Sequence, residues 1–374
     1  MSKKKLGFGL MRLPVLDRED NTTIDYEHVN KMVDQFMKDG FTYFDTAAPY
    51  HKSFSEVAFR ECVAKRYPRD SYTITDKLSL FMIDRKEDIP GFFDAQLERC
   101  GIEYFDYYWL HALSKEAFEK AEAFDAFSFV AQKKAEGKTK HIGFSFHDSA
   151  EVLDEILTKH PEMEYVQLQI NYADWEDSEV QSRKCYEVCV KHGKPVIVME
   201  PVKGGLLANV PAEAERLMKE AEPEMSSASW AIRFAASLEN VMVVLSGMSN
   251  EEQMADNLSY MKDFRPLDEK EKELIGKVNG VYQSMERIAC TGCRYCVDGC
   301  PQQIAIPDYF RLVNIISKFG ETRRKAAKSD YAELVGHGHG RASECVGCLQ
   351  CEEHCPQHLP ITKYLKDVAA TLED

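Results

Sequence analysis

Eight of the twelve cysteines lie in two short runs in the last quarter of the chain. The runs are CTGCRYCVDGCP, from Cys290 to Pro301, and CVGCLQCEEHCP, from Cys345 to Pro356. Both have the spacing C-x2-C-x2-C-x3-C-P, which wraps three thiolates around one [4Fe–4S] cluster. In a reducing compartment such runs indicate metal binding and not disulfide bonds. The sequence therefore predicts two [4Fe–4S] clusters.

The fourth cysteine of each run is predicted to ligate the cluster of the other run. In proteins with two such runs, the last cysteine points away from its own triplet and completes the neighbouring cluster. The predicted ligand sets are Cys290, Cys293, Cys296 and Cys355 for one cluster, and Cys345, Cys348, Cys351 and Cys300 for the other. Zinc is the alternative metal, but zinc ribbons use pairs of CxxC and not triplets with a distant fourth cysteine.

A second set of reactive residue types follows three apolar runs in the first third of the chain. Asp45 ends TYFD, Lys77 ends YTITDK and His111 ends YYWLH. Tyr50 comes five residues after Asp45, in DTAAPYH. Each residue alone has an ordinary explanation, as a turn cap, an exposed lysine or a hydrogen-bonded core histidine. Three polar side chains at three consecutive strand ends are harder to explain by packing, and we interpret them as one site.

These four side chains together can transfer a proton to or from a substrate oxygen. A tyrosine hydroxyl is a weak acid at neutral pH, and a nearby ammonium stabilises its phenolate. Lys77 can supply that ammonium, and Asp45 can keep it protonated and in place. His111 can hydrogen-bond the substrate oxygen and orient it. Such a site protonates an alkoxide as hydride arrives at a carbonyl carbon, or carries out the reverse reaction.

Eight short apolar runs alternate with helical patterns from residue 6 to about residue 265. The predicted strands are Leu6–Leu10, Thr42–Asp45, Tyr72–Lys77, Tyr107–His111, His141–Ser145, Tyr165–Ile170, Val196–Glu200 and Val241–Ser246. Short continuous apolar runs are typical of parallel strands that are buried on both faces. Eight strand–helix units in about 260 residues predict a (β/α)8 TIM barrel. A doubly wound sheet is the alternative, but the G-x-G-x-x-G that usually follows its first strand is missing.

The motifs FDTAAPY, TDKL, WLHAL and IGFSFH, in this order, resemble those of the aldo-keto reductase superfamily. The resemblance extends from about Leu6 to Phe264. It implies a (β/α)8 barrel that uses a nicotinamide cofactor without a Rossmann fold. It also implies that the catalytic tetrad of the family falls on Asp45, Tyr50, Lys77 and His111.

The resemblance further implies which residues contact the dinucleotide. Ser145 and Gln167 match the positions that hold the carboxamide, and Met199 lies where many members stack an aromatic ring on the nicotinamide. The loop around the pyrophosphate is matched by Pro201, Lys203 and Gly204. The segment at the adenosine ribose, SGMSNEEQMADN, contributes Gly247, Ser249, Gln253, Asp256 and Asn257. Because it lacks the Lys and Arg with which many members bind a 2′-phosphate, NADP is only slightly preferred over NAD.

The two sets of residues indicate two domains, a barrel over residues 1–275 and a two-cluster [4Fe–4S] domain over residues 276–374. The long helical stretch between the two cysteine runs resembles that of α-helical ferredoxin domains, so the second domain is expected to be mainly helical. The chain has 374 residues, of which 44% are hydrophobic, enough for a sizeable core. The other four cysteines, expected to be small buried residues, are Cys62, Cys100, Cys185 and Cys189.

Net charge and hydropathy exclude some classes of partner and indicate where the protein is located. The formal net charge of −15 argues against nucleic acid and against an anionic membrane surface as partners. The sequence contains no apolar run that could span a bilayer and no signal h-region. We therefore expect a cytoplasmic protein that acts on a small carbonyl or alcohol substrate.

The two predicted sites handle electrons differently. A nicotinamide gives up hydride and a [4Fe–4S] cluster moves one electron, so direct exchange normally needs a flavin. In one interpretation the barrel is a carbonyl reductase with structural or regulatory clusters, and in another a flavin links the barrel to the clusters. In a third, a ferredoxin-type electron-transfer protein, the clusters pass electrons to a substrate in the barrel and nicotinamide is secondary or absent. The complete tetrad favours the first interpretation, whereas the cost of maintaining two clusters favours the other two. A ferredoxin or other electron carrier is a candidate partner.

Overall fold

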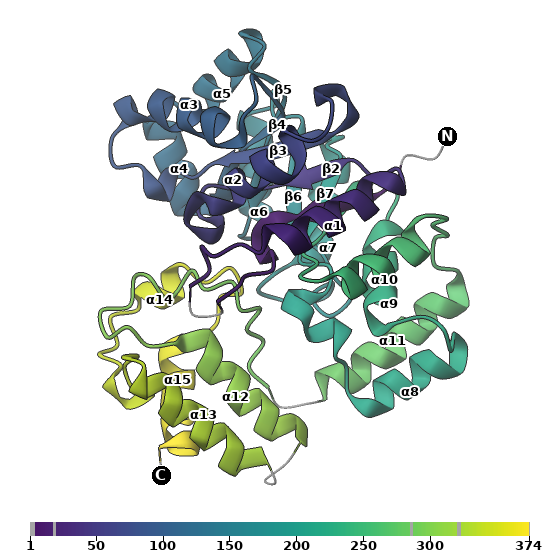
Figure 1. The fold of residues 1–374 in the computed structure, drawn as a ribbon, viewed down its shortest axis with the longest axis vertical. Coiled ribbons are helices and arrows are strands. Elements are labelled where there is room, and N and C mark those ends of the chain that lie inside the picture. The colour runs from purple at the N-terminus through teal and green to yellow at the C-terminus, as the bar shows by residue number, and fades with distance from the viewer. Residues whose placement is uncertain (1–3, 18–19, 285–286, 320–322, 374) are drawn as a thin grey trace. The chain divides into compact units, whose positions relative to one another are not determined.

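The computed structural model describes residues 4–17, 20–284, 287–319 and 323–373 (Figure 1). The chain forms two compact units, one of Met1–Pro201 with Ala228–Lys272 and one of Val202–Ser227 with Glu273–Asp374. The segment Val202–Ser227 therefore interrupts the first unit in sequence and belongs to the second. The expected division into domains at 275/276 stays a prediction.

The first unit contains a closed barrel of eight parallel strands in sequence order, in which β8 pairs with β1. The strands are β1 (Leu6–Gly9), β2 (Tyr43–Asp45), β3 (Thr73–Leu78), β4 (Phe105–Leu113), β5 (Thr139–Phe146), β6 (Tyr165–Gln169), β7 (Val196–Met199) and β8 (Val241–Ser246). This confirms the (β/α)8 barrel, and the doubly wound sheet is wrong. The predicted strands overlap the observed ones, although β4 begins and ends two residues further out than expected.

Helices connect the strands and surround the barrel (Figure 1). Their bounds are α1 (Tyr26–Lys38), α2 (Phe54–Phe59), α3 (Ile89–Cys100), α4 (Lys115–Ala123), α5 (Ala126–Ala135), α6 (Ala150–Lys159), α7 (Ser182–Lys191), α9 (Ser227–Ala236) and α10 (Glu251–Met261). The next helix, α11 (Glu269–Gln283), begins in the first unit and continues into the second. The side chain of Ser149 caps α6, and that of Asn250 caps α10. Such caps satisfy a backbone donor that the first turn leaves free, so these helix starts are encoded locally.

Alternate side chains of the strands fill the inside of the barrel. One buried cluster consists of Tyr43, Trp109, Ile197, Val243 and Leu245, from β2, β4, β7 and β8. Because β2 and β7 are not neighbours in the sheet, this cluster can form only across the interior. Residues two positions further along a strand face the same side. The next layer, which includes Asp45 on β2 and His111 on β4, therefore lies at the carboxyl ends of the strands.

The second unit is mainly helical, as predicted. Its helices include α8 (Ala212–Ala221), α12 (Ile306–Phe319), α13 (Arg324–Gly336), α14 (Gln350–Glu353) and α15 (Ile361–Leu372). Tyr309, Phe310 and Leu365 are buried in its hydrophobic core, and cysteines of both runs pack with this core. The four scattered cysteines of the first unit are buried, as expected.

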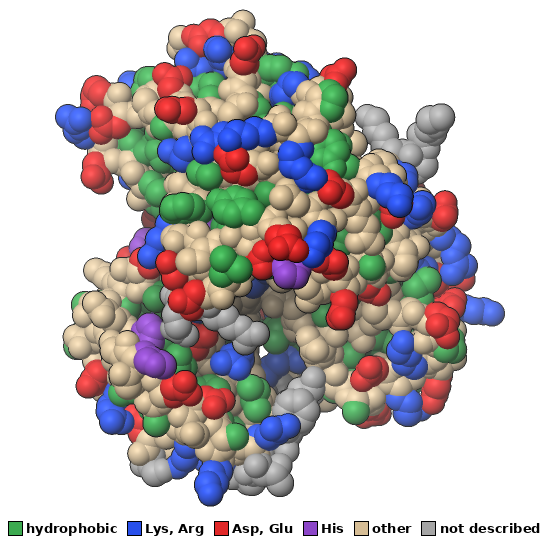
Figure 2. All heavy atoms as spheres, in the orientation of Figure 1, with side chains coloured by type: hydrophobic (Ala, Val, Ile, Leu, Met, Phe, Trp, Pro, Cys, Tyr) green, Lys and Arg blue, Asp and Glu red, His purple; other side chains and the backbone are tan. Residues whose placement is uncertain are grey.

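Charged side chains of both signs are mixed on one face of the molecule (Figure 2). On the face that Figure 2 shows, Lys and Arg side chains are interspersed with Asp and Glu. Among the charged side chains of the described residues, Lys31 pairs with Glu27 and Lys65 with Glu61 along their helical segments. Within the described ranges, no helix has the length and apolar character needed to cross a membrane.

Candidate active site and candidate cluster sites

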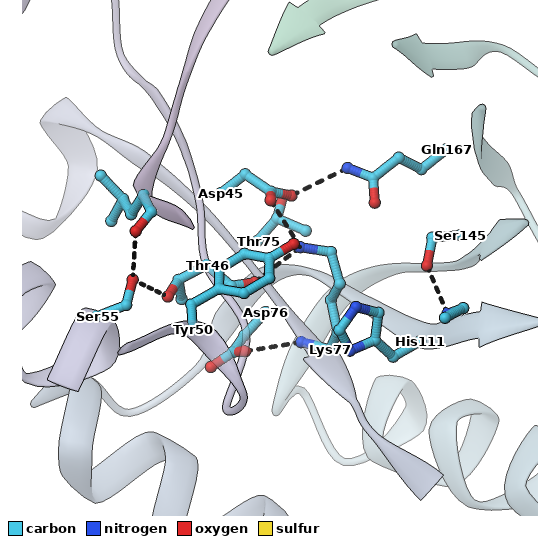
Figure 3. A network of polar contacts seen from close by, with 12 residues as sticks. Asp45, Thr46, Tyr50, Ser55, Thr75, Asp76, Lys77, His111, Ser145 and Gln167 are labelled. Atoms are coloured by element: carbon cyan, nitrogen blue, oxygen red, sulfur yellow. Dashed lines mark hydrogen bonds and ion pairs between the residues drawn. The ribbon is translucent and has the colours of Figure 1, made fainter. Parts of the chain in front are cut away.

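Asp45 and Lys77 form a buried ion pair at the carboxyl ends of β2 and β3 (Figure 3). Lys77 Nζ donates to Asp45 Oδ1 at 2.6 Å and to the backbone oxygen of Thr46 at 2.8 Å. Asp45 is 3% exposed and Lys77 is fully buried. Buried charges need such extra hydrogen bonds, because the loss of hydration opposes their mutual attraction. The contacts therefore hold the ammonium in one position.

The carboxyl group of Asp45 is under two opposing influences. Burial raises the pKa of Asp45 above its ordinary value, whereas Lys77 and the amide of Gln167 act to lower it. Gln167 Nε2, on β6, donates to Asp45 Oδ2 at 3.2 Å. Both carboxyl oxygens thus accept a hydrogen bond, which favours the charged form.

Tyr50 reaches the same ammonium from the loop after β2. It begins the 3-10 helix Tyr50–Ser53 and is half-buried. Its hydroxyl oxygen lies 3.4 Å from Lys77 Nζ, and Figure 3 shows the ring pointing at the ion pair. The next three residues, His51, Lys52 and Ser53, have φ values of 50°, 51° and 72°. Left-handed non-glycine residues cost roughly 1–3 kcal/mol each and tend to cluster at functional sites.

His111 lies opposite Tyr50 at the end of β4. The two rings are 6.1 Å apart and meet edge to face at 85°. Nδ1 of His111 is 2.6 Å from the hydroxyl oxygen of Ser79. The pairing register of β4 with β5 shifts between Leu110 and Leu113, and Ala112 has a φ of 56°. A local irregularity of this kind re-aims a side chain at a strand end.

The imidazole of His111 is uncharged at neutral pH. Burial is the main cause that lowers the pKa of His111 well below its ordinary value, and the nearby charges of Lys77 and His147 act in the same direction. A neutral imidazole has one donor and one acceptor nitrogen. With Nδ1 bonded to Ser79, Nε2 is the nitrogen that remains for a ligand.

Ser145 and Gln167, both predicted to hold the carboxamide, are brought together by the sheet. They are direct partners in the register of β5 with β6, and both are buried. The hydroxyl oxygen of Ser145 accepts from the backbone nitrogen of Ala112 at 2.7 Å. Met199, the other residue predicted at the nicotinamide, is half-buried at the end of β7.

The five residues predicted at the adenosine ribose lie after β8 and on α10. Ser249 N donates to Gln253 Oε1 at 2.8 Å, so two of them are in contact. Gly247 approaches the side chain of Arg12, where an added Cβ would be 3.2 Å from Cδ. Asp256 is half-buried and Asn257 is buried. The buried Oδ1 of Asn257 has no hydrogen-bond donor in the described part of the chain, which fits a segment that receives a polar ligand.

The residues predicted around the pyrophosphate divide between the two compact units. Pro201 ends a segment of the first unit, whereas Lys203 and Gly204 belong to the second. Lys203 Nζ donates to Gln357 Oε1 at 3.1 Å. No local pattern in the sequence indicates this contact, because the two residues lie 154 positions apart.

The eight clustered cysteines line two pockets of the second unit. One pocket contains Cys290, Cys293, Cys296 and Cys355, and the other contains Cys300, Cys345, Cys348 and Cys351. Each pocket thus combines one triplet with the fourth cysteine of the other run. Burial raises the pKa of Cys351 to about 11, and the neighbouring Cys345 and Cys300 are among the further causes.

The arrangement of these thiols suits a ligand larger than one ion. Each of the two pockets gathers four cysteines around a cavity. A zinc ion would draw its thiolates to about 2.3 Å from one point. A [4Fe–4S] cluster is larger and binds one thiolate at each iron, so four cysteines around a cavity fit it better.

Two groups of the barrel site are not predicted by the sequence. The backbone oxygen of Thr46 anchors Lys77, and the hydroxyl of Ser79 anchors His111. A weak signal existed for Ser79, since it lies two residues after Lys77 and therefore faces the same side of the strand. The contact of Thr46 is made by its backbone oxygen, so the residue type at this position does not predict it.

Two family models match the chain. The model of the Aldo/keto reductase family matches residues 5–279, and that of the 4Fe-4S dicluster domain matches residues 289–359. The comparison with curated proteins finds no match.

Solved structures of similar fold are aldo-keto reductases. The thermostable aldo-keto reductase Tm1743, in complex with the inhibitor epalrestat, is 20% identical, with a TM-score of 0.58 over 73% of this chain and 94% of that chain. The holo form of AKR11C1 from Bacillus halodurans is 22% identical, with a TM-score of 0.58 over 75% and 94%. An aldo-keto reductase from Klebsiella pneumoniae in complex with NADPH is 17% identical, with a TM-score of 0.56 over 77% and 98%. At these sequence identities, the similarity to the solved structures shows only that the barrel has the same fold.

Proposed function

This chain belongs to the aldo/keto reductase family and carries a C-terminal 4Fe-4S dicluster domain, and we propose that it reduces a carbonyl substrate, or oxidises the corresponding alcohol, with a nicotinamide dinucleotide. It is an oxidoreductase of the aldo-keto reductase type that acts on a small molecule. One observation carries the finer proposal: the buried ammonium of Lys77 lies 2.6 Å from the Asp45 carboxylate and 3.4 Å from the Tyr50 hydroxyl.

Tyr50 is the general acid of the reduction. Its hydroxyl proton goes to the oxygen of the substrate, and the adjacent ammonium of Lys77 stabilises the phenolate that remains. Asp45 balances the charge of Lys77 and holds it beside the hydroxyl. In the oxidation the same phenolate accepts the proton of the alcohol. A positioned general acid contributes roughly 10²–10⁴ to a rate.

His111 orients the substrate oxygen. Its neutral ring, bonded at Nδ1 to Ser79, leaves Nε2 to donate to that oxygen when Nδ1 accepts from the serine hydroxyl. A neutral imidazole donates without adding a second positive charge beside Lys77. Because the ring centres of Tyr50 and His111 lie 6.1 Å apart, both side chains can reach one oxygen atom.

The dinucleotide, when bound, supplies or accepts hydride. The proposed contacts are Ser145 and Gln167 at the carboxamide, Met199 at the nicotinamide, Pro201, Lys203 and Gly204 at the pyrophosphate, and Gly247, Ser249, Gln253, Asp256 and Asn257 at the adenosine ribose. The buried free Oδ1 of Asn257 supports a polar ligand at this segment. The preference for NADP over NAD is slight, and it is supported by similar folds that bind NADPH or NADP in Klebsiella pneumoniae proteins.

The substrate is proposed to carry an apolar or aromatic group. Phe81 follows β3 and is 51% exposed, and its ring lies 5.5 Å from that of His111. Its neighbour Met82 is 47% exposed. Exposed apolar side chains beside a reactive group gain free energy when an apolar ligand covers them. Phe81→Ala should therefore raise KM for aromatic aldehydes more than for short aliphatic ones.

The two [4Fe–4S] clusters, when bound, supply one-electron transfer. The two pockets, each with one triplet and the fourth cysteine of the other run, support the crossed ligand sets predicted from the spacing. The eight cysteines therefore act as ligands in two groups of four.

One observation favours the electron-transfer alternative. Cys348 is exposed, and its neighbours Val346 and Leu349 are 63% and 48% exposed. An apolar, accessible edge at a cluster ligand allows a ferredoxin or another electron carrier to approach. In this alternative the clusters deliver electrons to a substrate in the barrel, through a flavin or directly, and nicotinamide is secondary or absent.

Anaerobic purification followed by analysis of iron, sulfide, flavin and nucleotide separates these functions. NADPH and NADH are then titrated by fluorescence quenching, and aromatic aldehydes are offered as substrates. If the protein is the proposed reductase, it should bind a dinucleotide. It should also reduce aldehydes when the preparation contains no flavin. Absence of binding by both dinucleotides, with rapid reduction of the clusters by a ferredoxin, would establish the alternative.

A further inference from the structure

The segment after β7 is bonded to residues around the first cysteine pocket, which contains Cys290, Cys293, Cys296 and Cys355. Lys203 Nζ donates to Gln357 Oε1 at 3.1 Å, and the two side chains are 4% and 7% exposed. Gln357 also lines the first pocket. One glutamine side chain therefore borders the pocket and holds the buried ammonium of Lys203.

A second contact joins the same partners through the backbone. An added Cβ at Gly204 would lie 2.3 Å from the backbone oxygen of Thr291 and 2.5 Å from its Cα. Thr291 directly follows Cys290 and lines the first pocket. Only glycine allows this approach, so the position of Gly204 depends on the backbone of the cysteine run.

The backbone of the segment lies in the left-handed region at three consecutive residues. Lys203, Gly204 and Gly205 have φ values of 47°, 63° and 95°. A left-handed lysine is strained and persists when surrounding contacts hold it. The contacts to Gln357 and Thr291 are of this kind.

The supporting residues in turn depend on a metal site. Residues 287–294 have no regular secondary structure, and a loop of metal ligands takes its final shape when the metal binds. In this loop the backbone nitrogen of Gly292 donates to Cys290 Sγ at 3.4 Å, and such a hydrogen bond is stronger when the acceptor sulfur is ionised, as it is in a metal ligand. Loss of the first cluster would therefore release both contacts to Lys203 and Gly204.

We propose that the first cluster site holds the segment Val202–Leu207 through Gln357 and Thr291, and thereby sets the affinity of the protein for the dinucleotide. The proposal rests on the function proposed above, because it is the pyrophosphate of the dinucleotide that Lys203 and Gly204 are proposed to contact. Gln357 acts as a positioning residue that keeps Lys203 in place. The first cluster then has a regulatory role beside any electron transfer, and its damage by oxygen lowers dinucleotide binding.

The test compares Gln357→Leu with Gln302→Leu in the holoprotein, purified without oxygen. Gln302 lines the second pocket and is a matched glutamine beside the other cluster. Three quantities are measured: the EPR signals of the reduced clusters, hydrogen exchange of the amides of residues 203–208, and the Kd for NADPH. Loss of a hydrogen bond to a charged group predicts about tenfold weaker binding for Gln357→Leu. Exchange at residues 203–208 should rise in the same variant, and Gln302→Leu should resemble the wild type in both.

The outcomes separate this coupling from the function on which it rests. Suppose that the wild type binds NADPH and that Gln357→Leu changes neither the hydrogen exchange nor the Kd. The coupling is then refuted, and the proposed function is unaffected. Absence of NADPH and NADH binding by the wild type refutes the proposed function, and the coupling falls with it. If Gln357→Leu loses the first cluster signal, weaker NADPH binding supports the coupling and unchanged binding overturns it. An equal effect of Gln302→Leu also overturns it, since the second pocket would then act in the same way.

Discussion

Lys77 Nζ lies 2.6 Å from Asp45 Oδ1 across two neighbouring strand ends, and both groups are shielded from water. Neither charge would be stable there alone, since an unpaired buried ion costs several kcal/mol. Asp45 is therefore required for Lys77 to remain charged beside Tyr50. Substitutions in this ion pair should affect the stability of the protein and its activity differently.

Asp45→Asn should lower both stability and activity. It leaves the buried ammonium of Lys77 without its counter-charge, which costs about 3–5 kcal/mol of unfolding free energy. The double variant Asp45→Asn/Lys77→Met removes both charges and should recover most of the stability while carbonyl reduction stays lost. Anaerobic denaturant unfolding and steady-state kinetics check this. A double variant no more stable than the single one would contradict the ion-pair argument.

Tyr50→Phe should abolish most of the activity and leave the fold intact. The variant deletes one hydroxyl of a half-buried side chain, so the unfolding midpoint should stay near that of the wild type. The rate of aldehyde reduction should fall by roughly 10²–10⁴, the usual contribution of a general acid. The control is Tyr67→Phe, which removes a phenol hydroxyl that is bonded to Asp34 away from the site. Full activity in Tyr50→Phe would refute its role.

The lowered pKa of His111 predicts a pH dependence of stability. Burial, Lys77 and His147 hold the pKa of His111 well below its ordinary value, so on acidification the unfolded chain binds this proton first. Stability should therefore fall as the pH drops below about 6.5, by up to about 1.4 kcal/mol per pH unit from this residue. The raised pKa of Asp45 acts in the opposite sense at lower pH, since the folded state then takes up the proton first.

His111→Asn isolates that contribution. Its unfolding free energy should depend less on pH between about 5 and 6.5 than that of the wild type. Identical slopes in wild type and His111→Asn would show that this histidine does not titrate as inferred.

Asp76 should tolerate replacement by asparagine. Burial, followed by the charge of Glu56, raises the pKa of Asp76 well above its ordinary value, which indicates a protonated acid. Its Oδ1 accepts from the backbone nitrogen of Lys77 and from Gln96 Nε2, and an asparagine oxygen can do the same. Asp76→Asn should therefore keep the wild-type unfolding midpoint at pH 7.

Glu56 provides the contrast to Asp76. It is buried and pairs with Arg99, so Glu56→Gln leaves a guanidinium without its carboxylate and should cost about 1–3 kcal/mol. Thermal unfolding of the two variants side by side measures the difference. Equal destabilisation would mean that Asp76 is ionised in the folded protein.

Cys300→Ala should damage the cluster of Cys345, Cys348 and Cys351 more than that of its own run. Cys300 lines the pocket of the second triplet, and Cys355 lines that of the first, so Cys355→Ala should have the converse effect. EPR of the reduced protein, with signals assigned by variants within each triplet, distinguishes the two clusters. The crossed pairing fails if Cys300→Ala selectively removes the signal of the first triplet.

The positions of the barrel residues followed from local patterns. Asp45, Lys77 and His111 could be placed at strand ends because short apolar runs mark strands, and parallel strands of a closed barrel end on one face. The contacts that complete the site could not be placed. Ser79 on His111 and Gln167 on Asp45 depend on how side chains of different strands meet inside the barrel.

The sequence by itself determined the eight strands, the two cysteine triplets and the residue types of the barrel site, because period and spacing act over a few residues. Only the tertiary structure decided the contacts between distant segments. The closure of β8 on β1, the place of Cys300 beside Cys345, and the bond from Lys203 to Gln357 are such contacts. Each of these contacts depends on how the whole chain packs and buries its side chains. Local periodicity in the sequence carries no information about such packing.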